Sequence, residues 1–93
     1  MTQLKERRET AINGLFVLIE SELNEADKLM NLELERAVCC GRYPNYIKYI
    51  KSCLSNARFF LNYLQKYFPE SLGRALNLHS RYSNMTMACP LSA

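Results

Sequence analysis

The stretch PNYIKYIKSCLSNARFFLNYLQKYF, residues 44–68, decides the fold. It holds two neighbouring rows of mostly apolar residues, in which gaps of three and four positions alternate. The first row is Ile47, Ile50, Leu54, Ala57, Leu61, Leu64 and Phe68, and the second is Tyr46, Tyr49, Cys53, Asn56, Phe60, Tyr63 and Tyr67. This spacing is typical of one broad buried face on a helix. It predicts a helix from about Pro44 to Phe68.

A second amphipathic pattern precedes this stretch. Its apolar residues recur mostly at intervals of three, four or seven, and they are Leu4, Ala11, Ile12, Leu15, Ile19, Leu23, Ala26, Met30, Leu34, Ala37 and Val38. No proline interrupts them, so they predict one long buried stripe on a helix from about Gln3 to Cys39. A kink near Asn24 and a division into two helices are the alternatives. Gly41 suits the end of this helix and Pro44 the first turn of the next, which predicts an antiparallel hairpin.

Pro69 ends the second pattern, because a residue before proline avoids the helical region. A short third helix is predicted from about Glu70 to Leu78, with Leu72, Ala75 and Leu76 on one side. Residues 80–93 show no helical period and are predicted to form an extended tail. The expected fold is therefore all-α: a single helical domain over residues 1–79, with a long antiparallel hairpin and a short third helix, followed by the tail.

The composition limits the class of protein. The chain has 93 residues, and its longest aliphatic-aromatic run, residues 15–19, is far too short to span a bilayer. Its start lacks the apolar segment of a secretory signal, so a cytoplasmic location is expected. Reduced thiols are then expected at the four cysteines, which are Cys39, Cys40, Cys53 and Cys89.

Charge is distributed unevenly along the chain. Residues 1–35 carry four Lys/Arg and eight Asp/Glu, whereas residues 36–93 carry eight Lys/Arg and a single acid, Glu70. Attraction between acidic and basic helices within the fold explains much of this asymmetry. A basic face for nucleic acid or for an acidic partner is the alternative.

No catalytic or cofactor-binding motif is found. The sequence has no glycine-rich phosphate loop, no His-Glu-x-x-His motif and one histidine, His79. Cys39 and Cys40 are adjacent, whereas zinc sites usually pair cysteines two to four residues apart. We predict neither an enzyme nor a metal or cofactor site.

A protein partner is the preferred interpretation of the surface. The chain has six Tyr, four Phe and four Met, which are residues that mark interface cores. Phe59 breaks the polar face of the second helix and is the best anchor residue. The predicted partner-binding residues are Phe59, Tyr63, Tyr67, Pro69 and Arg74.

Two alternatives come from the same helix. Lys48, Lys51, Arg58 and Lys66 form a basic face that would suit a small nucleic-acid-binding regulator. The rows of apolar residues would also suit a self-associating helical scaffold. A salt titration separates the first alternative from an apolar protein interface, because affinity for phosphates falls steeply with salt.

The chain resembles the small phage-encoded modulators of the Abc type, found in Salmonella phages, that act against the RecBCD nuclease. The likeness lies in the start MTQLKERRETAINGLFVLIESEL, the tyrosine-rich YPNYIKYIKSCLSNARFFLNYLQKYF and the segment YFPESLGR. It implies a helical, non-enzymatic protein that binds the host RecBCD helicase-nuclease through RecC and favours phage recombination. It also implies a host peptidyl-prolyl isomerase as a companion, with Pro69 as its target. An aromatic-proline bond exchanges between cis and trans slowly without a catalyst.

Overall fold

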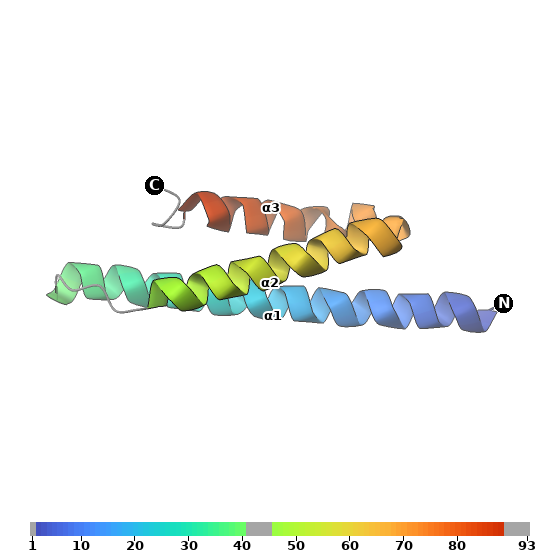
Figure 1. Cartoon of the computed structure of the whole chain (residues 1–93), viewed down its shortest axis with the longest axis horizontal. Coiled ribbons are helices and arrows are strands. Elements are labelled where there is room, and N and C mark those ends of the chain that lie inside the picture. The colour runs from blue at the N-terminus through green and yellow to red at the C-terminus, as the bar shows by residue number, and fades with distance from the viewer. Residues whose placement is uncertain (1, 41–45, 89–93) are drawn as a thin grey trace.

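The computed structural model of the chain describes residues 2–40 and 46–88, and these form three helices (Figure 1). Helix α1 (Thr2–Cys40) is continuous through Asn24, so the prediction of one long helix is confirmed. Helix α2 (Tyr46–Tyr67) packs antiparallel along α1, and the short 3-10 helix η1 (Pro69–Ser71) leads into α3 (Leu72–Ala88). The molecule is elongated, with extents of 59 × 19 × 17 Å. The predicted all-α hairpin with a third helix is therefore confirmed.

The core lies mainly between α1 and α2. Its buried residues are Ile12, Ile19, Leu23, Ala26 and Leu29 from α1, Ile50, Cys53, Leu54, Ala57, Leu61 and Leu64 from α2, and Ala75 and Leu78 from α3. The first row of α2 thus supplies the centre of the core. From the second row only Cys53 is buried, while Tyr49, Asn56, Tyr63 and Tyr67 are exposed. The second row therefore forms the edge of the core.

The predicted stripe on α1 is too long at both ends. Leu4 is 67% exposed and Leu34 is 63% exposed, so neither belongs to the core. Helix α1 has 39 residues and α2 has 22, which correspond to about 58 and 33 Å. The shorter helix leaves α1 without cover at its ends, so apolar periodicity overestimates the buried length. Ala37 and Val38 lie outside the described side chains.

The turn at Pro69 is fixed by local hydrogen bonds. The backbone N–H of Phe68 still donates to Leu64 O at 2.8 Å, which makes it the last bond of the α2 ladder. Ser71 then donates twice to Phe68 O, from its backbone N–H at 3.0 Å and from its hydroxyl at 2.7 Å. Because Ser71 is buried, this pairing meets its hydrogen-bonding need inside the fold. Pro69 therefore ends α2 as predicted.

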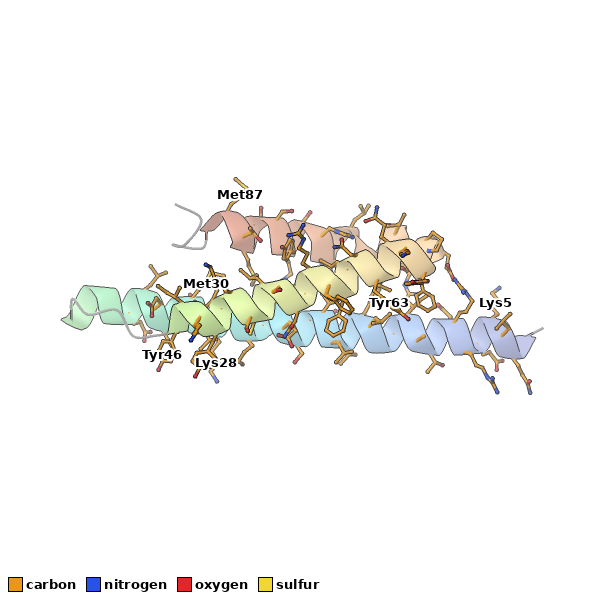
Figure 2. The ribbon with its side chains drawn as sticks, viewed as in Figure 1. Lys5, Lys28, Met30, Tyr46, Tyr63 and Met87 are labelled. Carbon is orange, nitrogen blue, oxygen red and sulfur yellow. The ribbon has the colours of Figure 1, made fainter. Side chains whose placement is uncertain are left out.

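The third helix is longer than the sequence indicates, which corrects the prediction of an extended tail after His79. Helix α3 continues to Ala88, and Leu78, Tyr82 and Met85 pack on the core at helical spacing. The predicted tail is therefore helical over residues 80–88, because tertiary packing outweighs a weak local pattern. Met87 points away from the other helices and is 82% exposed (Figure 2). Cys89 and Leu91 lie outside the described residues.

Arginine contacts hold α3 against α1. Arg74 pairs with Glu9 at 2.8 Å and donates to Asn13 Oδ1 at 2.9 Å, and Arg81 donates to Asn24 Oδ1 at 2.9 Å. Of these three contacts, the Arg74–Glu9 pair alone joins an acid of residues 1–35 to a base of residues 36–93, as the first interpretation of the charge asymmetry expects. Exposed ion pairs contribute little stability, so these contacts mainly set the flank and register of α3.

Candidate protein-binding groove

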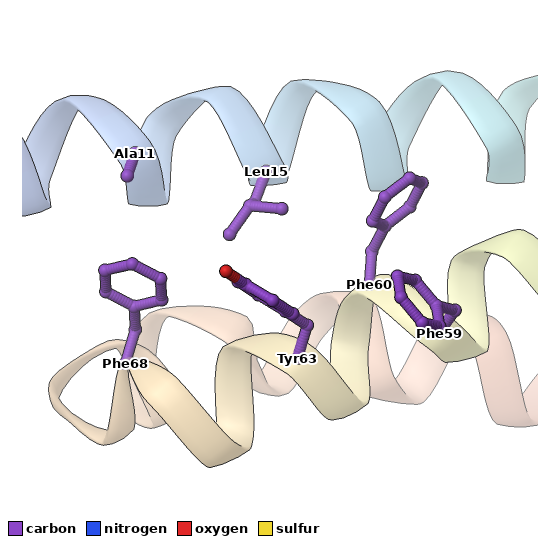
Figure 3. A pocket seen from close by; sticks show the side chains of 6 residues that line it. All are labelled: Ala11, Leu15, Phe59, Phe60, Tyr63 and Phe68. Atoms are coloured by element: carbon purple, nitrogen blue, oxygen red, sulfur yellow. The ribbon is translucent and has the colours of Figure 1, made fainter.

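A shallow apolar groove lies between the first half of α1 and the second half of α2. It has a volume of about 280 Å³, and its lining residues are Ala11, Leu15, Phe59, Phe60, Tyr63 and Phe68. Figure 3 shows Ala11 and Leu15 facing the aromatic side chains of α2 across the groove. Because the lining is almost entirely apolar, the groove suits an apolar side chain of a macromolecule better than a polar substrate.

The aromatic side of the groove is a continuous cluster of rings. Ring centroids are 5.7 Å apart for Phe59–Phe60, 4.7 Å for Tyr63–Tyr67 and 6.2 Å for Tyr63–Phe68. Such distances give favourable ring–ring contacts, which hold each side chain in place before any partner arrives. A surface that is already ordered loses less entropy on binding.

These rings are nevertheless open to solvent. Phe59 is 65% exposed, Tyr67 50% and Tyr63 41%. Helix α3 does not cover them, because it packs on the other flank of the hairpin. The α1 residues that bond to α3, Glu9, Asn13 and Asn24, project from the side of α1 opposite Ala11. One flank of the hairpin is therefore filled by α3, and the groove on the other flank stays open.

The arginine beside this turn is held within the fold. Arg8 donates from Nε to Glu70 at 2.7 Å and from its terminal nitrogen to Tyr67 O at 2.9 Å. Its guanidinium also lies 4.7 Å from the centre of the Phe68 ring. The hydrogen bond from Arg8 lowers the pKa of the Glu70 carboxyl, and the same bond raises the pKa of Arg8. Arg8 thus fixes the end of α2 at one end of the groove.

The structure brings together four of the five predicted partner-binding residues. Phe59, Tyr63 and Tyr67 share one flank of α2, and Pro69 is exposed at the following turn. Arg74 lies apart from them, since it is bonded to Glu9 on the flank of α1 that α3 covers. The structure therefore does not bring Arg74 together with the other four residues.

Sequence reasoning missed the α1 side of the groove. The apolar spacing predicts Ala11 and Leu15 on the buried stripe, yet Ala11 is exposed and Leu15 is half-buried. The same spacing places Phe60 and Phe68 in the two apolar rows, and both are half-buried at the groove. The one available signal is the width of the aromatic face on α2, which exceeds what a single neighbouring helix covers.

The predicted basic face is exposed but dispersed. Lys48, Lys51, Arg58 and Lys66 are all exposed and extend over 18 residues, about 27 Å of helix. Lys66 lies 5.3 Å from the centre of the Tyr67 ring, so it borders the aromatic cluster. The four charges do not converge on one point, unlike the cations of a phosphate pocket.

Cys53 is a buried thiol at the edge of the core. Burial, a hydrogen bond to Glu22 and the negative charges of Glu22 and Glu25 raise the pKa of Cys53 from 9.0 to about 11. A raised pKa keeps the sulfur protonated and unreactive at neutral pH. Cys53 is therefore a packing residue.

We expect Cys53 to react slowly with iodoacetamide at pH 8. The two-unit difference in pKa lowers its thiolate fraction about 100-fold relative to the unfolded chain. The measurement is peptide mass spectrometry over time, with the urea-unfolded chain as control. The pKa of Cys53 is higher in the folded chain than in the unfolded chain. The stability that the protonated thiol contributes to the fold is therefore complete below about pH 9 and is lost as the pH rises toward 11. Equal labelling rates in the folded and unfolded chains would contradict this assignment.

Residues 2–40 and 46–88 contain no cluster of three His, Cys, Asp or Glu side chains placed to hold a metal ion. Within the same residues, no helix combines the length and apolar character that crossing a bilayer requires. His79 is half-buried on α3.

Comparison of the chain with protein-family models, with curated proteins and with solved structures found no match.

Proposed function

We propose that this chain is a non-enzymatic helical protein that binds a larger protein through the aromatic groove. The observation that carries the proposal is the open cluster of Phe59, Tyr63 and Tyr67, ordered by ring contacts and left uncovered by α3. Aromatic side chains in a pre-ordered apolar patch are the usual anchors of protein interfaces. A partner that inserts an apolar side chain between Leu15 and Tyr63 would fill the groove.

The resemblance to phage modulators supplies the identity of the proposed partner. We infer that it is the host RecBCD helicase-nuclease, contacted through RecC in the cytoplasm of the host cell. Binding would alter the activity of the enzyme in favour of phage recombination. The exposed Pro69 would be accessible to a peptidyl-prolyl isomerase, and the turn that it begins sets the direction of α3.

Replacing Phe59 with alanine should weaken binding to purified RecBCD at least tenfold, because a central aromatic anchor contributes about 2 kcal/mol or more. The measurement is a titration of immobilised protein with RecBCD. The matched control is Leu76→Ala, which truncates a residue of equal exposure (66% against 65%) on α3. Unchanged binding by Phe59→Ala, or an equal loss in the control, would remove the groove from the proposal.

Nucleic-acid binding is the second candidate, favoured by the four exposed cations of α2. If these cations neutralise phosphates, the affinity for nucleic acid should fall steeply as the salt concentration rises. The affinity of an apolar protein interface is much less sensitive to salt. Copurification from a bacterial host under low and high salt therefore distinguishes the two. If nucleic acid copurifies and no protein does, the result would support nucleic-acid binding through the basic face.

A further inference from the structure

We infer that the open flank of the hairpin binds a second copy of this chain, in an antiparallel arrangement with α1 against α1. The inference concerns the free protein and does not depend on which larger protein it binds. It comes from one exposed stripe along α1 that is complementary to itself. The stripe consists of Arg7, Ala11, Gly14, Leu18, Ser21 and Glu25, at successive intervals of four, three, four, three and four residues.

The stripe adjoins the groove. Ala11 is a lining residue of the groove, and Leu18 lies two turns further along the same side of α1. Leu18 is 47% exposed although it is apolar. Phe59 and Tyr63 border the same flank from α2. The open flank thus carries exposed apolar side chains from both helices, Leu18 from α1 and Phe59 and Tyr63 from α2.

Gly14 permits a close approach at the centre of the stripe. A Cβ atom added at Gly14 would meet nothing within 4 Å, so the fold of one chain does not require glycine there. Glycine within a helix costs about 1 kcal/mol relative to alanine. A second helix that packs against the backbone at Gly14 would account for this cost, with Leu18 of each copy lying over Gly14 of the other.

Charge complementarity selects the second copy as the occupant. Arg7 and Glu25 lie at opposite ends of the stripe, each nine residues from position 16. A twofold axis at that level places Arg7 of each copy against Glu25 of the other, and Gly14 against Leu18. Within the described residues, neither Arg7 nor Glu25 forms an ion pair. Both charges are therefore available to a symmetric partner.

The available area indicates a dimer of modest affinity. From Arg7 to Glu25 the stripe is about 27 Å long, and the molecule is 19 Å across. Two such faces bury on the order of 1,000 Å², the lower limit of a specific interface. A dissociation constant on the order of micromolar is expected. Self-association would cover Phe59 and Tyr63, so a larger protein that uses the groove would have to displace the second copy.

Sedimentation velocity over a concentration series tests the inference with a charge exchange. Arg7→Glu and Glu25→Arg should each raise the dimer dissociation constant at least tenfold, because each creates two like-charge contacts across the symmetric interface. The double exchange restores both pairs with reversed sign and should return the constant to within about threefold of the original. Lys51→Glu, an exposed charge reversal on α2, is the matched control and should leave the constant unchanged.

A second variant tests the close approach separately from charge. Gly14→Gln places a side chain in open space, so helicity by circular dichroism should be retained or increased, while dimerisation should be lost. Three results would overturn the inference: a wild-type chain that stays monomeric at hundreds of micromolar, a double exchange no better than the single reversals, or a dimer indifferent to Gly14→Gln. In any of these cases the open flank serves a different protein. RecBCD binding measured on the same variants shows separately whether the proposed function holds.

Discussion

Replacing Leu23 with alanine should lower the free energy of unfolding by about 2–5 kcal/mol. Leu23 is 0% exposed and belongs to the core cluster between α1 and α2. Truncation removes apolar surface from the core and leaves a cavity that two long packed helices cannot easily close. A domain of this size is stable by about 5–15 kcal/mol in total. This one substitution should therefore remove a large part of the stability.

Urea unfolding followed by circular dichroism measures the effect of Leu23→Ala. Leu34→Ala is the matched control, since it makes the same truncation on the same helix at a residue that is 63% exposed. The control should change stability by less than about 0.5 kcal/mol. A similar loss of stability in both variants would mean that burial in the core does not decide how much each leucine stabilises the fold. That result would contradict the packing described above.

Replacing Glu33 with methionine should raise the free energy of unfolding by about 1–3 kcal/mol. Glu33 is only 3% exposed, and neither of its carboxylate oxygens has a hydrogen-bond partner in the described part of the chain. Burying a polar group that has no hydrogen-bond partner lowers the stability of the fold by the full desolvation free energy of that group. Methionine has a similar shape and a similar helix propensity, so the change mainly removes that cost.

The control for Glu33→Met is Glu35→Met, which makes the same replacement two residues later at an exposed position. Its effect should be within about 0.5 kcal/mol of zero. The thermal midpoints of both variants provide the comparison. A loss of stability in Glu33→Met alone would show that the carboxylate has a favourable interaction with its surroundings. Glu33 would then be part of a polar site near the start of α2.

Burial separates the residues that form the fold from the residues that are free to bind. Leu23 is fully buried, whereas Phe59 is mostly exposed although it is larger and equally apolar. Apolar residues that remain exposed beside a complete core are the ones for which a partner must be sought. Phe59 and Tyr63 are two such residues, and both line the groove on the flank that α3 leaves open.

The sequence by itself determined the two helices of the hairpin and the centre of the core. Alternating gaps of three and four residues place Ile50, Leu54, Ala57, Leu61 and Leu64 on one face, and all five are buried. Such spacing is a property of a single helix, so it can be read without knowing the neighbouring helix. The stop at Pro69 is equally local, because it follows from the missing N–H and the ring of proline.

Only the tertiary structure decided which flank of the hairpin is covered. The contacts that place α3 join Arg74 to Glu9, 65 positions away, and Arg81 to Asn24, 57 positions away. Contacts of this range leave no periodic trace in the sequence. The same packing extends α3 through Tyr82 and Met85 to Ala88, and it places Arg74 apart from the aromatic residues of the groove. The position of α3 therefore leaves the groove open, because a hairpin has two flanks and its third helix can fill only one.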